Sequence, residues 1–313
     1  MSERCLYCYQ ELNGAEKDFH ARCSKKIFGH AIPPDLPYSE DQMSDLAADI
    51  IKSHVAVTGV QPKLSVGIEK NPDKNAPDRI TIVGVFGDYI LKPPTAQYTN
   101  LPELEDLTMH LASITGIATV PHSLIRLQTG QLAYITKRID RHKRQKLHME
   151  DMCQLTERLT EHKYKGSYEQ IARVILKYSM NPGLDIINFF EQVIFCFLTG
   201  NNDMHLKNFS LIKPPDMGYS LSPAYDMVAA ALVVEEDTEE LALNLNGKKN
   251  KIKRKDFEAA MGHLDGRVTA NIFSRFRKSI PKWESFIDVS FLSAEMQQRY
   301  KELIKAKAGQ LEL

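Results

Sequence analysis

The segment Gly200–Phe209 places a carboxylate and an amide five residues apart, at Asp203 and Asn208. In phosphoryl-transfer enzymes with a D-x-x-x-x-N loop, the Asp accepts the proton of the attacking hydroxyl and the Asn holds a magnesium ion. The H-R-D triplet of that loop is absent here, and Asp next to Asn or Gly is also common in turns. The spacing therefore indicates phosphoryl transfer but needs support from further groups.

A second acid, Asp226, strengthens this interpretation. Residues Ser210–Ile212 are expected to form a short strand and Lys213–Gly218 a turn, after which the chain returns to Asp226. Magnesium prefers a hard oxygen shell, which Asn208, Asp226 and the phosphate oxygens of ATP would supply. Either acid alone could cap a turn, but the two acids in this order favour a metal site.

Phosphoryl transfer also needs a cation for the phosphates, and Lys92 is the candidate. Residues Ile80–Phe86 and Tyr89–Lys92 are apolar or alternating, which predicts a hairpin with its turn at Gly87–Asp88. Two prolines follow Lys92, and proline does not continue a paired strand. The lysine is thus expected at a strand end.

An acid that would hold this lysine lies on the next predicted helix. Residues Leu101–Ala112 carry leucine at positions 104, 107 and 111, which is the spacing of one helix face. Glu105 lies off that face and could meet Lys92 on a neighbouring strand, although most helical Glu side chains are solvated.

A loop that covers the nucleotide is predicted at Val57–Lys63, before an alternating strand with apolar residues at 64, 66 and 68. Glycine permits close backbone approach to a phosphate, and hydroxyl, amide and ammonium groups can donate to it. An ordinary hairpin entry would look similar. The candidate nucleotide contacts are Thr58, Gly59, Val60, Gln61 and Lys63.

Four possible metal ligands lie near the N-terminus, in two pairs that each have a two-residue gap: Cys5 with Cys8, and His20 with Cys23. This spacing is typical of tetrahedral zinc sites, and a metal can order a segment that has few apolar residues. The alternative is a set of ordinary reduced cysteines with His20 in a turn.

Composition bounds the class of protein. The chain has 313 residues, 43% of them hydrophobic, a formal net charge of zero and a pI near 7.1. This is enough material for two lobes, and neutrality argues against broad nucleic-acid affinity. No signal peptide is apparent, and the apolar run Val193–Leu198 is too short to cross a bilayer. We therefore expect a cytoplasmic protein with a core helix that begins near Leu184.

Two basic runs, Lys137–Lys146 and Lys248–Lys255, stand out from this neutral background. An acidic run, Glu235–Glu240, precedes the second of them. The two neighbouring runs could neutralise each other, or they could bind a partner or a tRNA-linked substrate.

Several of these segments, in this order, make the chain resemble the HipA-like serine/threonine kinases, the toxins of bacterial toxin–antitoxin modules, over nearly its whole length. The resemblance implies an α+β, two-lobed protein-kinase-like fold of the HipA type, with a small β-rich N-lobe and a larger helical C-lobe. The segments that carry it are Thr58–Lys63, Ile90–Lys92, Glu105, Lys137–Arg141, Glu150–Gln154, Asn202–Phe209 and Tyr225–Asp226.

Position by position, the resemblance implies Asp203 as the catalytic base and Asn208 and Asp226 as magnesium ligands. Lys92, held by Glu105, would bind the ATP phosphates. The other nucleotide-site candidates near these groups are His205, Lys207 and Tyr225.

The same resemblance implies a hinge at Lys137, Arg138 and Ile139, whose backbone would bind the adenine. Asp140 and Arg141 would brace that hinge.

Regulation by autophosphorylation is a further expectation from the family. Members commonly carry a phosphorylated serine just before the covering-loop glycine, but Ala56 and Val57 occupy that stretch here. Thr58 is the first candidate site and Ser53 the second, because a phosphate at this tip would displace the loop from ATP. Constitutive activity is the alternative.

Full-length family members carry an additional small N-terminal domain before the matching region, and we expect this chain to be without it, so that it resembles the shortened, HipT-type toxin. In such systems a separate small antitoxin protein replaces that domain, and a helix-turn-helix DNA-binding protein is the third component. The implied activity is ATP- and magnesium-dependent phosphorylation of a protein, such as an aminoacyl-tRNA synthetase. A small-molecule or lipid kinase and a silent pseudokinase that binds protein or RNA are the alternatives.

The expected organisation has four parts. Residues 1–30 form the Cys/His segment, residues 31–136 the N-lobe, residues 137–141 the hinge and residues 142–313 the C-lobe. A linker helix is expected over Asp41–Lys52. The N-lobe is expected to end in a hairpin of Ser123–Gln128 with Gln131–Thr136.

Overall fold

The computed structural model describes residues 3–14, 16–43, 45–46, 62–83, 87–142, 145–234 and 236–313. The chain forms two compact units that are not consecutive in sequence. Unit 1 comprises Met1–Asp106, Val120–Arg144 and Val289–Phe291, and unit 2 comprises Leu107–Thr119, Gln145–Asp288 and Leu292–Leu313. The predicted α+β order, a β-sheet near the N-terminus followed by helices, is confirmed.

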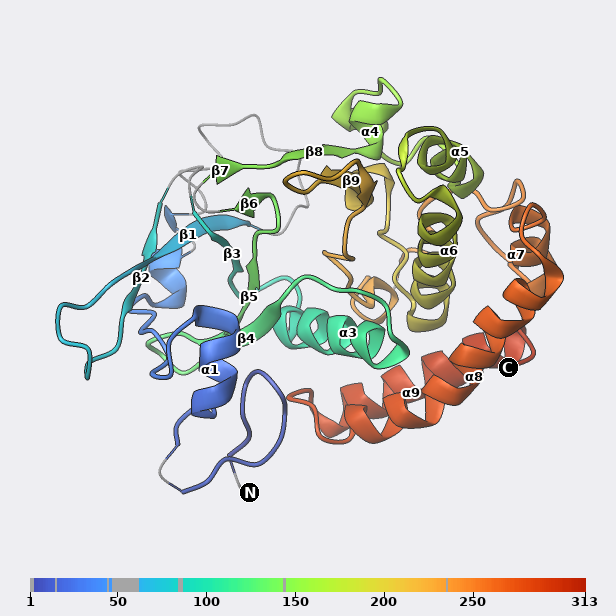
Figure 1. Ribbon diagram of the computed structural model, residues 1–313. Helices are drawn as coiled ribbons and strands as arrows, with labels where there is room; N and C mark the ends of the chain where they lie inside the picture. The colour runs from blue at the N-terminus through green and yellow to red at the C-terminus, as the bar shows by residue number, and fades with distance from the viewer. Residues whose placement is uncertain are drawn as a thin grey trace. The chain divides into compact units, whose positions relative to one another are not determined.

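Unit 1 is built on a five-stranded antiparallel sheet with the strand order β2-β1-β3-β5-β4 (Figure 1). The hairpin predicted for residues 123–136 is confirmed, because β4 and β5 pair antiparallel with Leu124 opposite Tyr134. The strands are β1 Leu64–Glu69, β2 Arg79–Ile82, β3 Tyr89–Lys92, β4 His122–Arg126 and β5 Leu132–Lys137.

The hairpin predicted between residues 80–86 and 89–92 is wrong. Strand β1 lies between β2 and β3, so that Val66 has Ile82 on one side and Tyr89 on the other. The apolar pattern identified both strands, but their proximity in sequence suggested the wrong neighbour. A Cβ at Gly87 would lie 2.6 Å from the Val66 carbonyl oxygen, so glycine is required where the chain passes close to β1.

The N-terminal part of unit 1 contains helix α1 Ala21–Phe28, which ends at Gly29 in the left-handed conformation. Residues 40–43 and 45–46 are helical, in agreement with the start of the predicted linker helix, while residues 47–52 lie outside the described residues. Helix α3 Leu101–Thr115 supplies its first residues to unit 1 and the rest to unit 2. Strand β6 Arg141–His142 lies near the end of the middle segment of unit 1.

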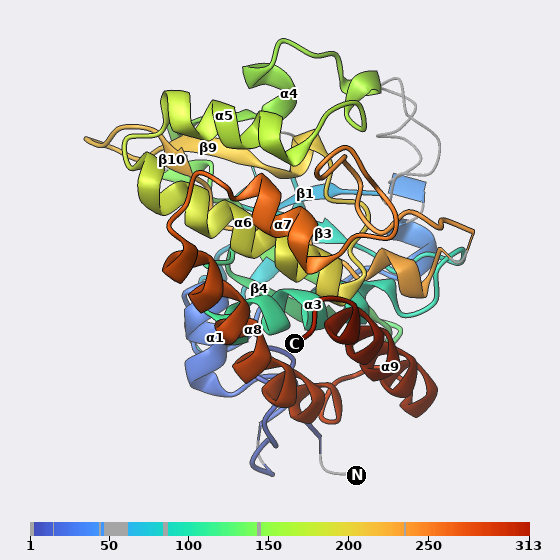
Figure 2. The same ribbon diagram turned by 90° about the vertical axis from the view of Figure 1, so that its right-hand side faces the viewer.

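Unit 2 is mainly helical and also contains a three-stranded sheet in the order β10-β9-β8. Its helices α5 and α6 lie side by side, as Figure 2 shows. The strands are β7 Gln145–Lys146, β8 His148–Asp151, β9 Ser210–Lys213 and β10 Ser220–Leu221. The helices are α4 Met152–Leu155, η1 Thr160–His162, α5 Tyr168–Tyr178, α6 Pro182–Thr199, η2 Leu206–Asn208, η3 Ala230–Leu232, α7 Arg254–Ala260, α8 Gly266–Ile287 and α9 Ala294–Gln310.

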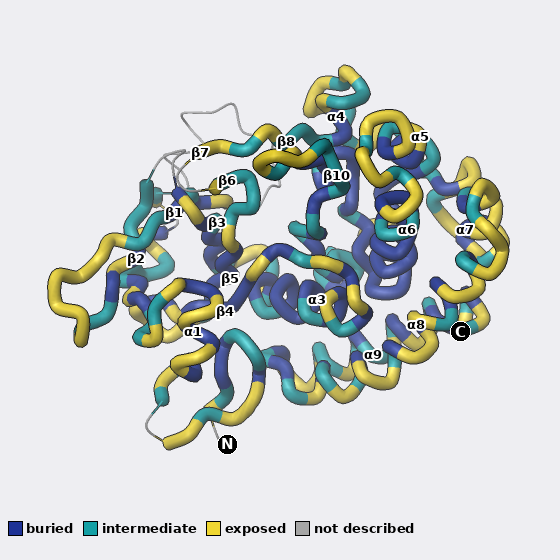
Figure 3. The backbone as a smooth tube through the Cα atoms, viewed as in Figure 1, coloured by how far each residue is buried: buried dark blue, intermediate teal, exposed yellow. Residues whose placement is uncertain are grey.

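Helix α6 is the core of unit 2 and matches the predicted core helix. It is apolar almost all round, and Figure 3 draws most of it as buried. Phe195 packs edge-to-face on Trp283 of α8, with the ring centroids 5.5 Å apart. Among the described residues, α6 alone has the length and hydropathy of a membrane span, but 72% of that window is buried inside the protein. It also carries buried Asp185, Glu191 and Gln192, as expected for the core helix of a folded domain.

Candidate active site

The lysine and glutamate predicted to meet in unit 1 do form an ion pair. Lys92 Nζ at the end of β3 donates to Glu105 Oε1 of α3 at 2.5 Å. Both side chains are buried, with residue exposures of 4% and 1%. Lys92 Nζ also lies 5.4 Å from the ring centre of Tyr134. Because removing an ammonium from water costs several kcal/mol, the ion pair with Glu105 offsets part of the cost of burying Lys92.

Asp106, the next residue on α3, organises a second buried network in unit 1. Its Oδ1 lies 2.6 Å from His122 Nδ1 on β4, and its Oδ2 accepts the Tyr9 hydroxyl at 2.8 Å. Burial raises the pKa of Tyr9 well above its usual value, so Tyr9 remains a neutral donor. This network anchors the helical turn that carries Glu105. No sequence pattern predicted this network, because Tyr9 is separated from Asp106 by 97 positions.

The predicted hinge begins at the last residue of β5, and two of its arginines donate to an aspartate within the hinge. Arg138 donates to both carboxylate oxygens of Asp140, at 2.9 and 2.8 Å, and Arg141 also donates to this carboxylate. Burial opposes ionisation of Asp140, but the two guanidinium groups outweigh it and lower the pKa of this carboxyl. The amide of Lys137 donates to the Pro121 carbonyl at 2.8 Å and that of Arg138 to the Asp88 carbonyl at 2.8 Å.

The loop predicted to cover the nucleotide, with Thr58, Gly59, Val60 and Gln61, lies outside the described residues, as does Ser53. Lys63 is described; it is exposed and directly precedes β1. The alternation predicted for this strand is confirmed at Leu64 and Val66, which are buried, while position 68 is half-buried.

In unit 2, the candidate catalytic loop begins where α6 ends. Gly200 caps the helix in the left-handed conformation, with φ of 67°, and its amide bonds back to the last turn of α6. A Cβ at this position would lie 2.6 Å from Leu303 Cδ2 of α9. Glycine is therefore needed both for the backbone angle and for the close approach of α9.

Within this loop the side chain of the predicted amide, Asn208, is hydrogen-bonded to the backbone of the predicted base, Asp203. Asn208 Nδ2 donates to the backbone carbonyl of Asp203 at 3.1 Å, and Asn208 is buried while Asp203 is half-buried. The hydroxyl of Tyr164 donates to Asp203 Oδ1 at 2.5 Å, and the Tyr164 ring packs edge-to-face on His205. Burial and the contact with Asp203 raise the pKa of Tyr164, which keeps its hydroxyl protonated.

A chain of hydrogen bonds ties the catalytic loop to the segment that carries Asp226. The Tyr225 hydroxyl donates to the Lys207 carbonyl at 3.0 Å and lies 2.5 Å from Ser210 Oγ on β9. Lys207 Nζ donates to Asp151 Oδ2 at 2.6 Å. Asp226 has a positive φ of 60°, a conformation that Asp tolerates better than most residues and that is common at functional sites.

Two residues of this network, Tyr164 and Asp151, were not predicted as site residues from the sequence. Tyr164 lies in an irregular stretch without a motif, so nothing in the sequence marks it as a partner of Asp203. Asp151 was detectable as a helix start, because Asp151 and Gln154 form a capping box at α4 with bonds of 3.0 and 2.9 Å. Its contact with Lys207 depends on the tertiary structure.

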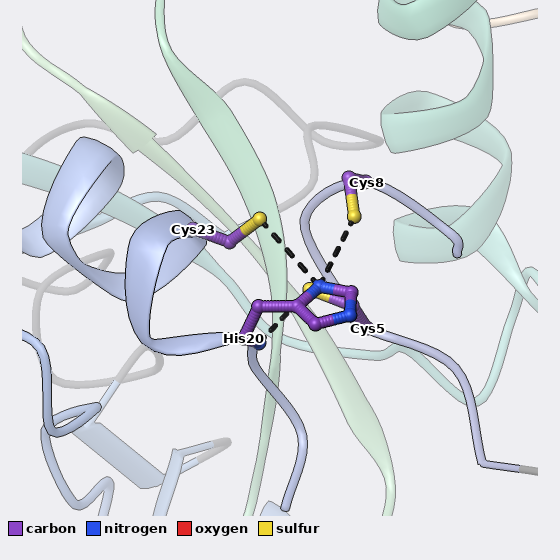
Figure 4. Close-up of side chains that lie close together, drawn as sticks. All are labelled: Cys5, Cys8, His20 and Cys23. Atoms are coloured by element: carbon purple, nitrogen blue, oxygen red, sulfur yellow. Dashed lines mark hydrogen bonds between the residues drawn. The ribbon is translucent and has the colours of Figure 1, made fainter. Parts of the chain in front are cut away.

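The four predicted metal ligands near the N-terminus lie together, as Figure 4 shows. Their ligand atoms all lie within 4.8 Å of one another. Burial raises the pKa of Cys8, and it raises the pKa of Cys23 to about 12 with a further contribution from Cys5. The remaining cysteines, Cys153 and Cys196, are buried in unit 2.

The acidic run and the second basic run of unit 2 are joined by an ion pair and by a hydrogen bond to the backbone. Lys249 Nζ lies 2.8 Å from Glu239 Oε2, and Glu240 Oε2 accepts the amide of Ile252 at 2.8 Å. Glu240 also pairs with Lys307 of α9 at 2.6 Å. The internal-pairing alternative is therefore confirmed for Lys249 and Glu239, whereas Lys248 pairs with Asp256, outside the acidic run.

A family model named the HipA-like C-terminal domain matches residues 55–284, which is most of the chain. This chain belongs to the HipA-like family. The matched range covers the Lys92–Glu105 pair, the hinge, the candidate catalytic loop and Asp226, while the Cys/His segment precedes it.

Two curated relatives of this HipA-like chain bear kinase names. "Putative kinase Y4dM" of Sinorhizobium fredii is 30% identical over 301 residues, which is 91% of this chain and 70% of the relative. A "Putative kinase" of Haemophilus influenzae is 30% identical over 210 residues, which is 63% of this chain and 59% of the relative.

Two solved structures share the mixed α/β fold of the HipA-like chain. HipA of Shewanella oneidensis MR-1, from a toxin–antitoxin complex of HipA, HipB and operator DNA, matches with a TM-score of 0.69 and 20% identity, over 90% of this chain and 73% of that one. The proinflammatory kinase CtkA of Helicobacter pylori matches with a TM-score of 0.53 and 15% identity, over 71% of this chain and 87% of that one.

Proposed function

We propose that this HipA-like chain is an ATP- and magnesium-dependent serine/threonine protein kinase. The observation that carries the proposal is the hydrogen-bonded loop of unit 2, in which Asp203 and Asn208 are joined directly and Tyr225 ties the segment before Asp226 to the same loop. The buried Lys92–Glu105 pair of unit 1 supplies the charge that nucleotide phosphates require.

The orientation of Asn208 fits a magnesium ligand. Its Nδ2 is used as a donor to the Asp203 carbonyl, so its Oδ1 is the atom that would face a cation. Asn208 and Asp226 would together present hard oxygen ligands of the kind magnesium prefers. When bound, magnesium would neutralise the phosphates of ATP.

Asp203 is suited to accept a proton from a substrate hydroxyl. Its Oδ1 accepts a hydrogen bond from the neutral Tyr164 hydroxyl, which orients the carboxylate for proton transfer. The half-exposed position of Asp203 would let a protein side chain reach it. Positioning and charge stabilisation, rather than covalent chemistry, would then supply the rate.

For the adenine, we propose the backbone of Ile139. The amides of Lys137 and Arg138 already donate to carbonyl groups of unit 1, so Ile139 is the hinge position best suited to offer an amide to the base. The ion pairs of Asp140 would keep this stretch in place.

The biological role that we propose is that of a HipT-type toxin acting in the cytoplasm, with a separate small antitoxin and a helix-turn-helix DNA-binding partner. Two similarities support it: membership of the HipA-like family and the likeness in fold to a HipA crystallised with HipB and operator DNA. A translation component such as an aminoacyl-tRNA synthetase is the proposed substrate, and Thr58 or Ser53 the proposed autophosphorylation site.

Incubation of the purified chain with labelled ATP, magnesium and a bacterial lysate tests the activity. A labelled protein band, absent with Asp203→Asn, is the expected result. Label in a metabolite or lipid would show a different kinase class, and no incorporation together with retained partner binding would show a pseudokinase. Mass spectrometry of the labelled proteins would identify the target and the self-modified residue.

A further inference from the structure

The Cys/His cluster of unit 1 has the dimensions of an assembled metal site. His20 Nδ1 lies 3.4 Å from Cys8 Sγ and 3.8 Å from Cys23 Sγ, and all four ligand atoms lie within 4.8 Å of one another. Zinc bonds of about 2.3 Å to sulfur and about 2.1 Å to nitrogen, in a tetrahedron, place ligand atoms roughly 3.6–3.8 Å apart. The cluster therefore needs little movement to bind such an ion.

Local structure holds each ligand in place. Cys5 and Cys8 lie in a loop closed by the antiparallel bridge between Arg4 and Glu11. His20 and Cys23 lie at the start of α1, and the His20 amide donates to Cys5 Sγ at 3.5 Å. Figure 4 shows the side chains of the loop and of the helix pointing toward one another.

The second nitrogen of His20 indicates which nitrogen would bind a metal. His20 Nε2 lies 3.0 Å from the Glu11 carbonyl oxygen. A carbonyl can only accept, so Nε2 carries the proton and the lone pair of Nδ1 faces the three sulfur atoms. An outer hydrogen bond of this kind is a regular feature of histidines that bind metals.

We propose that Cys5, Cys8, His20 and Cys23 bind one zinc ion, and that this site braces the helical turn that carries Glu105. Three sulfur ligands and one nitrogen in a tetrahedral arrangement favour zinc. All four positions are filled by protein groups, so the site is structural and has no open position for a substrate.

The segment held by the cluster is docked on the rest of unit 1 by specific contacts. The Leu6 carbonyl, between the first two cysteines, accepts the Leu124 amide at 3.3 Å and Ser123 Oγ at 3.1 Å. The loop of Leu6 thereby covers part of β4, the edge strand of the sheet. The backbone groups on the outer side of an edge strand have no neighbouring strand to pair with. One residue beyond Cys8, the buried Tyr9 donates to Asp106.

The brace follows from the position of Asp106. Tyr9 and His122 hold Asp106, and the adjacent Glu105 holds Lys92. Loss of the metal would release the loop that positions Tyr9, and the turn of α3 would lose the contact of Tyr9 with Asp106. This part of the inference rests on the proposed function, because Lys92 is assigned there to the phosphates of ATP.

Metal content tests the site independently of any kinase activity. We expect one zinc per chain in the purified full-length protein, measured by elemental analysis, and loss of it in Cys8→Ser and Cys23→Ser. Cys153→Ser, which changes a buried cysteine of unit 2, should retain it. Wild-type protein without metal, or zinc retained in both cluster variants, would overturn the site.

A spectroscopic measurement on the wild-type chain tests the site without variants, which could lose zinc only because they fail to fold. Cobalt(II) exchanged into the protein should give intense visible absorption and thiolate-to-cobalt charge-transfer bands, as tetrahedral thiolate coordination requires. Absence of these bands after addition of cobalt(II) to metal-free protein would overturn the tetrahedral site.

Tyr9→Phe tests the brace, with Tyr7→Phe from the same loop as its matched control. Tyr9→Phe should retain zinc but raise the KM for ATP several-fold with little change in kcat, whereas Tyr7→Phe should change neither. An unchanged KM in Tyr9→Phe would overturn the brace and leave the zinc site standing. A wild-type chain that binds zinc but transfers no phosphate would instead refute the proposed function.

Discussion

The candidate site residues of unit 1 and those of unit 2 have different surroundings. In unit 1, Lys92 and Glu105 are both buried and neutralise each other. In unit 2, Asp203 is half-buried, and a neutral tyrosine hydroxyl orients it. From this difference we infer that a group which only positions a ligand can be buried in an ion pair. A group that must exchange a proton with a substrate has to remain reachable, with a partner that does not take its charge.

The largest expected effect comes from removing the proposed proton acceptor, Asp203. Asp203→Asn keeps the shape of the side chain and can still accept from Tyr164, but it cannot act as a base. We expect kcat to fall by about 10²- to 10⁴-fold, with a change in unfolding free energy within about 0.5 kcal/mol. Phosphotransfer assays and denaturant unfolding check the two parts. Asp216→Asn, an exposed acid of the same unit, is the control and should keep wild-type activity.

Breaking the buried pair should, unlike Asp203→Asn, cause a large loss of stability. Glu105→Gln leaves the Lys92 ammonium buried without its carboxylate, which typically costs about 3–5 kcal/mol. Denaturant unfolding measures this loss. The double variant Lys92→Met/Glu105→Gln should recover part of the stability but none of the activity. A stable, fully active Glu105→Gln would contradict the positioning role of the pair.

A smaller effect is expected from the partner of Asp203. Tyr164→Phe removes one hydrogen bond to the carboxylate, worth about 1 kcal/mol, so kcat should fall roughly five-fold. Steady-state kinetics with saturating ATP measures the change. Tyr178→Phe, an exposed tyrosine at the end of α5, provides the comparison, and an equal loss in both variants would argue against a specific role for Tyr164.

The smallest effect concerns Asp256, a buried acid that serves structure alone. Burial opposes its ionisation, but Lys248 Nζ at 2.7 Å and Asn246 Nδ2 at 2.9 Å outweigh this and lower its pKa below the ordinary value of 3.8. Its contribution to stability is therefore complete above about pH 3.8 and is lost as the pH falls through the lower, folded-state pKa. Urea unfolding between pH 6 and pH 3 should show a weaker acid dependence for Asp256→Asn than for the wild type.

Local patterns predicted much of the fold. The leucine spacing of residues 101–112 gave α3, the apolar run gave α6, and the turn at Thr129–Gly130 gave the pair of β4 and β5. The same kind of reasoning gave β2 and β3 but not their partner, because strand pairing depends on contacts distant in sequence. The candidate site shows the same limit: Asp203 and Asn208 were found from their spacing, whereas Tyr164 was not.

The sequence by itself determined which residues could do chemistry, because the spacing of D-x-x-x-x-N and of the two Cys/His pairs is local and the segments around them have clear helix and turn signals. The spacing of Glu105 also predicted its contact with Lys92. The contacts of Tyr9 with Asp106 and of Tyr164 with Asp203 depend on the tertiary structure alone. The physical reason is that each of these contacts replaces solvation lost on burial. The chain must therefore bring a compensating partner to each group from whatever distance in sequence the fold allows.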